Sequence, residues 1–283
     1  MSFERVGALS QIQVELLDLW MPGAEVVRDH GWGLVATTVL EVEHEGCRRI
    51  VKAGGEQDGH IHREIRAHRN WLRPWTSGGR APDLVHSDDA AKLVVTRYLP
   101  GRLVLGDPSA DDPETYRQAG ELLAALHGQL SERDADHDGR ANAKALSWLD
   151  GPHRIERSVE RRLRAEIASW PDDPVTVVPT HGDWPPRNWL VHDGVVTVID
   201  LGRADLRPAM TDLTRLAPQD FLRDPDLAVA FFDGYGSDPR EPAAWHRTRV
   251  REALGTATYA FVIGDEAFEA QGHRMIATAL SDA

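Results

Sequence analysis

Residues that could carry out phosphoryl transfer lie close together in one stretch of the chain. The segment His181-Gly182-Asp183 is followed by Asn188, and a β-branched run at 195–199 leads into Asp200. Such a run predicts a short buried strand. Phosphoryl transfer needs a carboxylate that accepts the proton of the attacking hydroxyl group, and an amide oxygen with a second carboxylate for Mg²⁺. A turn in which Asp and Asn cap backbone amides is the alternative, but the loop, the strand and the second Asp together favour catalysis.

The same segments resemble the catalytic and metal-binding segments of the aminoglycoside phosphotransferases, a family with the protein-kinase-like fold. In that family an H-G-D-x4-N loop takes the place of the kinase H-R-D-x4-N loop, and an Ile-Asp pair, here Ile199-Asp200, stands where kinases have D-F-G. The resemblance implies that Asp183 is the catalytic base and that Asn188 and Asp200 bind Mg²⁺. It also makes Asp212, in a downstream D-L-x-x-L element, a structural brace for the loop.

The overall composition limits the partners of the protein. The chain has 283 residues and a formal net charge of −13, which repels nucleic acid and anionic membranes and favours cationic ligands. Cys47 is the only cysteine, so no intrachain disulfide is expected and a reducing compartment fits. We find no signal-peptide pattern and no apolar run as long as a membrane span. A cytoplasmic protein without nucleic-acid or membrane partners is therefore expected.

The N-terminal part of the chain is typical of an antiparallel sheet with one helix. Residues 24–42 predict a strand, a turn with Gly31 and Gly33, and a second strand, and residues 47–53 predict a third strand that contains Lys52. Taken alone, the glycines indicate a hairpin and the lysine a solvated side chain. The resemblance implies that the two glycines cover the phosphates of ATP. It also implies that Lys52 holds these phosphates, supported by Glu64 on the next helix.

Two further strands, at 84–87 and 92–99, are predicted to complete this sheet, and Pro100-Gly101 ends the second of them. The resemblance implies a hinge at this point, whose main chain at Arg97, Tyr98 and Leu99 binds adenine. An ordinary strand end is the alternative, and the sequence alone does not separate the two.

Residues after the hinge are predicted to be mainly helical. Apolar residues at helical spacing indicate a helix that begins near Pro113, followed by a loop at 132–151 and a second helix at about 155–170. Further helices are expected C-terminal to the catalytic segment, where the resemblance implies an acceptor pocket. Carboxylates there would neutralise an amine of the acceptor. The candidates, for which a surface position is the alternative, are Asp233, Asp238, Asp265, Glu266 and Glu269.

These observations predict an α+β protein of two lobes with the protein-kinase-like fold. Residues 1–97 would form a small lobe with an antiparallel sheet, and residues 98–283 the hinge and a mainly helical catalytic lobe. The expected function is phosphorylation of a hydroxyl group on a small molecule, with ATP or GTP and Mg²⁺, by a monomer or homodimer. The resemblance favours an aminoglycoside or another antibiotic as acceptor. The alternatives are a metabolic kinase acting on choline, homoserine, a hexose or a fructosamine, and a non-catalytic nucleotide-binding relative.

Overall fold

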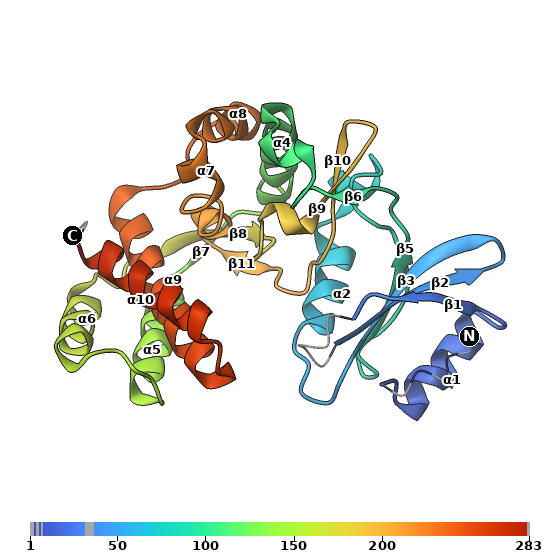
Figure 1. The fold of residues 1–283 in the computed structure, drawn as a ribbon, viewed down its shortest axis with the longest axis horizontal. Coiled ribbons are helices and arrows are strands. Elements are labelled where there is room, and N and C mark those ends of the chain that lie inside the picture. Colours follow the sequence, from blue (N-terminus) through green and yellow to red (C-terminus); the bar gives the residue numbers. More distant parts are fainter. Residues whose placement is uncertain (1–2, 4–5, 7, 32–36, 282–283) are drawn as a thin grey trace.

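The structure, a computed structural model, describes the chain except residues 1–2, 4–5, 7, 32–36 and 282–283. Its N-terminal part contains a five-stranded antiparallel sheet in the order β1-β2-β3-β5-β4 (Figure 1). Valine, leucine and threonine recur along these strands because such side chains fit a pleated surface. The strands are β1 (Glu25–Asp29), β2 (Thr37–His44), β3 (Cys47–Gly54), β4 (Leu84–Asp88) and β5 (Leu93–Arg97).

The two faces of this sheet are covered by different helices, α1 (Gln11–Trp20) and α2 (Ile61–Asn70). Leu17 of α1 shares one core with Val51 of β3, whereas Ile65 of α2 shares another with Val94 of β5. Successive side chains of a strand point to opposite faces. Lys52 lies next to Val51 in β3 and opposite Val94 in the sheet, so its side chain is on the face that α2 covers.

Helix α2 also contacts the segment that follows Asp200. His60, at the start of the helix, has its Nδ1 2.9 Å from the carbonyl oxygen of Gly202. Further along the helix, Arg66 Nη2 lies 2.7 Å from a carboxylate oxygen of Asp205. Helix α2 therefore connects the N-terminal sheet to the part of the chain that carries the predicted metal ligands.

Two three-stranded sheets lie between the N-terminal sheet and the C-terminal helices (Figure 1). Their orders are β10-β9-β6 and β11-β8-β7, and neighbouring strands in both are antiparallel. The strands are β6 (Arg102–Leu103), β7 (Glu132–Asp134), β8 (Val175–Thr180), β9 (Trp189–His192), β10 (Val195–Val198) and β11 (Asp205–Arg207). The predicted strand before Asp200 is thus β10, whose Val196 and Val198 are buried.

The C-terminal part is mainly helical and has two apolar cores. The remaining helices are α3 (Arg73–Thr76), α4 (Pro113–His127), α5 (His137–Asp150), α6 (Arg157–Ser169), α7 (Asp220–Arg223), α8 (Pro225–Tyr235), α9 (Pro242–Ile263) and α10 (Glu266–Ser281). One core joins α4 and α8 to the aromatic cluster of Tyr116, Trp184 and Trp189, and the other joins α5, α6, α9 and α10. Sheet and helices together give the predicted α+β architecture. Within the described residues, none of the helices has both the length and the apolar character needed to cross a bilayer.

The prediction of a loop at 132–151 is wrong, because this segment forms β7 and α5. Its Asp-, Ala- and Gly-rich composition provides little local apolar periodicity. Ala145 and Leu149 are nevertheless buried in the core that they share with Leu254 of α9. Tertiary packing therefore stabilises a helix that local propensity does not reveal. The predicted boundary after residue 97 coincides with the end of β5, and we propose it as the division between the two lobes.

Candidate active site

The loop that connects β8 to β9 contains the H-G-D segment, and its backbone requires the glycine. Gly182 has a φ of 81°, and a Cβ at this position would lie 2.2 Å from the carbonyl oxygen of Arg203. Only glycine fits both the left-handed conformation and the close approach. The ring of His181 donates from Nε2 to the carbonyl oxygen of Ile199 at 3.1 Å, while its Nδ1 accepts from the amide of Asp183 at 3.3 Å. The histidine thus joins the loop to the residue before Asp200.

The buried carboxylate of Asp212 binds the backbone of this loop. Asp212, in the 3₁₀ helix η4 (Ala209–Leu213), accepts hydrogen bonds from the amides of His181 and Gly182 at 2.8 and 2.6 Å. His127 of α4 contacts the same carboxylate through Nε2 at 3.1 Å. Burial alone would raise the pKa of Asp212, but the hydrogen bonds from His127 and Gly182 outweigh it and keep the pKa below its ordinary value. These are the contacts expected of a brace.

Asp183 lies almost buried at the centre of a polar cluster. Asn188 Nδ2 donates to the Asp183 carbonyl oxygen at 2.8 Å and to its Oδ2 at 3.1 Å. Oδ1 of Asp183 accepts from Arg187 Nη2 at 2.5 Å and lies 3.2 Å from Nε of Arg215. Arg215 in turn pairs with Glu252 of α9 at 3.3 Å. Sequence reasoning missed both arginines. Arg187 could have been noticed next to Asn188, whereas nothing in the sequence relates Arg215 to Asp183.

Lys52 lies between two carboxylates. Its Nζ is 2.9 Å from Glu64 Oε2 and 3.3 Å from Asp200 Oδ1, so the predicted Lys52–Glu64 ion pair is present. Burial lowers the pKa of Lys52, but attraction to Asp200 and Glu64 outweighs burial and raises the pKa above its ordinary value. Burial raises the pKa of Glu64, against the attraction of Lys52. The ammonium group remains charged and is oriented toward the segment that contains Asp200.

Asn188 and Asp200 have the chemistry of Mg²⁺ ligands. The amide of Ile199 donates to the Asn188 carbonyl oxygen at 3.0 Å, which brings the two residues to neighbouring positions. Attraction to Lys52 lowers the pKa of Asp200 to about 2, so this half-exposed carboxylate is ionised at neutral pH. Both hydrogen bonds donated by Asn188 come from Nδ2, and within the described part of the chain none reaches its Oδ1. An ionised carboxylate and a free amide oxygen fit the preference of Mg²⁺ for hard oxygen ligands.

The three hinge residues predicted to contact adenine differ in whether their backbone amides already donate a hydrogen bond within the protein. The amide of Arg97 donates to the Asp83 carbonyl oxygen at 2.9 Å, and that of Tyr98 to the Arg48 carbonyl oxygen at 3.3 Å. No hydrogen bond between described residues uses the amide of Leu99. Of the three amides, that of Leu99 is therefore the free one, and binding of adenine by the main chain of the three residues stays a prediction.

The predicted glycine turn is described only in part. The Gly31 amide donates to Asp29 Oδ1 at 2.7 Å, a contact of a local turn. Gly33 lies outside the described residues. The phosphate-covering role of both glycines stays a prediction.

The five acidic residues predicted to bind the acceptor are either engaged by other groups of the protein or exposed. Asp238 pairs with Arg240 at 2.6 Å, Asp265 accepts from the amide of Phe268 at the start of α10, and Glu269 is buried beside Arg154. The other two, Asp233 and Glu266, are exposed. None of the five is among the residues that line the cavity described next. A substrate contact by any of them stays a prediction.

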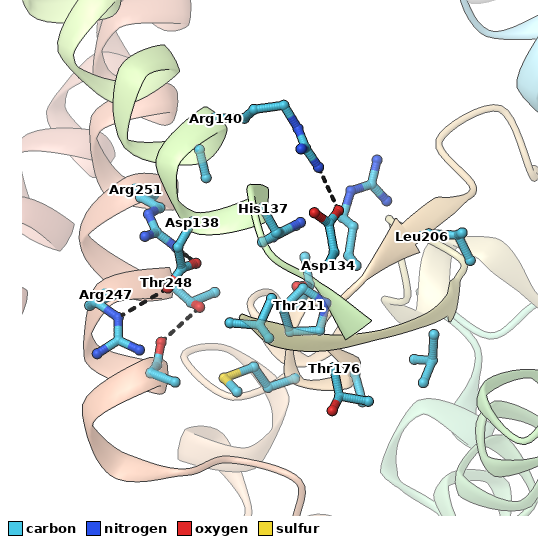
Figure 2. A pocket seen from close by; sticks show the side chains of 18 of the residues that line it. Asp134, His137, Asp138, Arg140, Thr176, Leu206, Thr211, Arg247, Thr248 and Arg251 are labelled. Carbon is cyan, nitrogen blue, oxygen red and sulfur yellow. Dashed lines mark hydrogen bonds and ion pairs between the residues drawn. The ribbon is translucent and has the colours of Figure 1, made fainter. Parts of the chain in front are cut away.

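A cavity of about 1070 Å³ lies between the β11-β8-β7 sheet and the helices α5 and α9 (Figure 2). Its size is that of pockets that bind small ligands. One lining residue lies against the catalytic loop, and a second is connected to Asp183 through another side chain. Arg207 lies against Gly182, since a Cβ atom on this glycine would be 2.7 Å from Arg207 Nη1. Glu252 pairs with Arg215, which contacts Asp183. The cavity therefore extends to within one side chain of Asp183.

Comparison with known proteins identifies the class. A model of the phosphotransferase enzyme family, APH, matches residues 39–250, which is more than half of the chain. The chain therefore belongs to the phosphotransferase enzyme family. A search of curated proteins gave no match.

Solved structures of similar fold include three with different acceptors in their names. Choline kinase LicA from Streptococcus pneumoniae is 14% identical with a TM-score of 0.67, covering 96% of this chain and 98% of that chain. Aminoglycoside phosphotransferase APH(4)-Ia, in a ternary complex with ADP and hygromycin B, is 12% identical with a TM-score of 0.67 and the same coverage. Macrolide 2'-phosphotransferase MphH from Brachybacterium faecium is 20% identical with a TM-score of 0.60, covering 93% and 97%. At these identities the likeness shows the protein-kinase-like fold.

Proposed function

We propose that this phosphotransferase transfers the γ-phosphoryl group of ATP to a hydroxyl group of a small molecule, with Mg²⁺. The observation that carries the proposal is Lys52, whose Nζ lies between Glu64 at 2.9 Å and Asp200 at 3.3 Å. Kinases use such a lysine to hold ATP phosphates beside the metal ligand. Solved relatives were crystallised with ADP, AMP and AMP-PNP, which supports the use of an adenine nucleotide here.

In the proposed reaction, Asp183 accepts the proton of the acceptor hydroxyl group. The hydroxyl oxygen forms a bond to the γ-phosphorus while the bond between this phosphorus and the β–γ bridging oxygen breaks, and ADP leaves. Asn188, Arg187 and Arg215 fix the Asp183 carboxylate, and Lys52 positions the phosphates. Mg²⁺ held by Asn188 and Asp200 would screen the charge of the phosphates.

The class of acceptor has two candidate readings. The sequence resemblance favours an aminoglycoside or another antibiotic, in a resistance or self-protection role. A metabolic acceptor such as choline, homoserine, a hexose or a fructosamine is the alternative, and a choline kinase is among the structures of similar fold.

The test is ADP release from ATP and Mg²⁺ across a panel of these acceptors. Asp183→Asn should lower kcat by orders of magnitude while ATP still binds, because the change removes the proton acceptor but keeps the shape. Asp193→Asn, the same exchange at a side chain that is 91% exposed, is the matched control and should turn over normally. Acceptor-dependent turnover that survives Asp183→Asn would refute Asp183 as the base, and absence of ATP binding by the unmodified protein would refute the proposed function.

A further inference from the structure

The cavity beside the catalytic loop differs in charge from the chain as a whole. The full sequence has 45 Asp and Glu residues against 32 Lys and Arg, whereas the cavity lining has six acidic and seven basic side chains. A site that selects an acceptor with several amines needs acidic groups that are available to pair with them. The available charge of the cavity therefore decides which acceptor it suits.

Most of the acidic side chains in the lining are already engaged. Glu241 accepts from two backbone amides at the start of α9, and four others pair with arginine. Figure 2 shows Asp134 with Arg140 on one side of the cavity and Asp138 with Arg247 and Arg251 on the other. The close pairs are Asp134–Arg140, Asp138–Arg251, Asp205–Arg66 and Glu252–Arg215. Within the described residues, only Asp173 of the lining acids lacks a hydrogen bond or ion pair.

Several lining arginines, in contrast, are poorly neutralised. Arg207 and Arg247 have side chains only 24% and 15% exposed. Each reaches its acid at a long distance, Asp205 at 3.8 Å and Asp138 at 3.6 Å, because a second arginine lies closer to the same carboxylate. Arg63 has no hydrogen bond or ion pair within the described part of the chain. Arg207 Nη1 donates to Thr180 Oγ1 and to the Arg203 carbonyl oxygen, but both acceptors are neutral. A partly buried guanidinium group without a close anion is costly, so the three groups would gain from an anion in the cavity.

The three arginines come from different elements and line one space. Arg63 lies on α2, Arg207 on β11 and Arg247 on α9. Repulsion from Arg63 contributes to the lowered pKa of Arg207, after the larger effect of burial, which indicates that the two groups act on each other. Arg207 is also the residue next to Gly182 of the catalytic loop. An anion bound here would hold a ligand close to Asp183.

We propose that the acceptor carries an anionic group, a carboxylate or a phosphate ester, which Arg63, Arg207 and Arg247 bind while its hydroxyl group faces Asp183. This inference rests on the proposed function, because it takes the cavity as the acceptor site. A guanidinium group forms paired hydrogen bonds with two oxygens of either anion, so the shared chemistry is that of a hydroxylated oxyanion. Polycationic acceptors are disfavoured, since their amines would meet arginines and acids that are already paired.

The experiment compares ligands that differ in charge. Glucuronate, glucose 1-phosphate, glucose and glucosamine, which share one hexose ring, and the polyamine kanamycin are titrated into the protein with AMP-PNP and Mg²⁺. Binding is followed through the arginine Nε–Hε resonances in NMR spectra. We expect one or both anionic sugars to shift the resonances of the cavity arginines and to bind about tenfold or more tightly than glucose or glucosamine, as one partly buried ion pair would provide. Whichever of glucuronate and glucose 1-phosphate binds more tightly shows whether the site prefers a carboxylate or a phosphate.

Variants then connect the preference to named side chains. Arg247→Gln and Arg63→Gln should each remove most of the preference for the anion, whereas Arg161→Gln, on an exposed part of α6 outside the lining, should retain it. Tighter binding of glucosamine or kanamycin in the cavity would overturn the proposal, as would anionic sugars that leave the cavity resonances unchanged. ADP release is measured in parallel. Anion binding without ADP release for any acceptor would refute the phosphotransfer but not the charge preference, so the two failures are distinguishable.

Discussion

The hydrogen bonds that Asp212 accepts from the catalytic loop predict how much stability is lost when this carboxylate is replaced. Asp212→Asn keeps the shape of the side chain but replaces one acceptor oxygen by an NH₂ group. Asp212 Oδ1 accepts from Gly182, and Oδ2 from His181 and His127. Whichever way the new amide turns, at least one backbone N–H then faces another donor. Loss of one charge-assisted hydrogen bond with a buried amide left unpaired costs about 3 kcal/mol, and for a chain of this size that lowers Tm by about 5 °C.

The assay combines thermal unfolding with steady-state kinetics of ADP release. Because Asp212 contacts the loop rather than the nucleotide, kcat should fall while the KM for ATP changes little. Asp193→Asn, at an exposed turn, is the matched control and should change neither quantity. An Asp212→Asn protein with unchanged Tm and kcat would show that these hydrogen bonds do not hold the loop, and would refute the reasoning.

Three further perturbations follow from the same structure. Lys52→Met leaves the carboxylate of Glu64, 5% exposed, without its ion-pair partner and should lower the free energy of unfolding by about 3 kcal/mol in urea denaturation; the double variant with Glu64→Gln should recover most of this, and no recovery would contradict the pairing. Gly182→Ala should destabilise by about 2 kcal/mol or more because its Cβ would meet a backbone oxygen at φ 81°, whereas Gly59→Ala, where a Cβ has open space, should be near neutral. Both ring nitrogens of His68 are buried and have no hydrogen-bond partner among the described residues, and burial lowers the pKa of His68 from 6.5 to about 4. The unfolded chain therefore takes up the proton first, and stability should fall as the pH decreases from about 6.5 to 4, by roughly 2 kcal/mol at pH 5; His68→Leu should flatten this decline, and an equally steep decline in the variant would exclude His68 as its origin.

The sequence predicted the parts of the site that depend on local spacing. Asp183 and Asn188 belong to one short loop, and Asp200 follows a β-branched strand that pairs with the strand after this loop. Local periodicity and a short connection were enough for these positions. The pair of Lys52 and Glu64 was expected only from the family resemblance, and the structure contains it.

The parts that were not predicted depend on contacts between distant segments. Arg215 reaches Asp183 only after η4 and the segment that follows it have packed beside β8. The cavity beside the catalytic loop depends on α5, a helix with weak local signals, and on which faces of α9 and α5 turn toward each other. Asp233 and Asp265 were chosen as candidates for their charge alone. The sequence does not show which way these side chains face, because packing in the folded protein sets the orientation of a helix.

The contacts of α2 have a consequence for the rate of the catalytic cycle. His60 and Arg66 bind the segment 202–205, and Lys52, on the sheet face that α2 covers, binds Asp200. Moving the N-terminal sheet away from the remainder of the protein therefore requires these contacts to break together or α2 to leave the sheet. Bonds that break together give two discrete arrangements rather than a continuous series. We expect release of ADP to pass through such a concerted opening, so that the strength of contacts far from the phosphates sets how fast the enzyme can begin its next turnover.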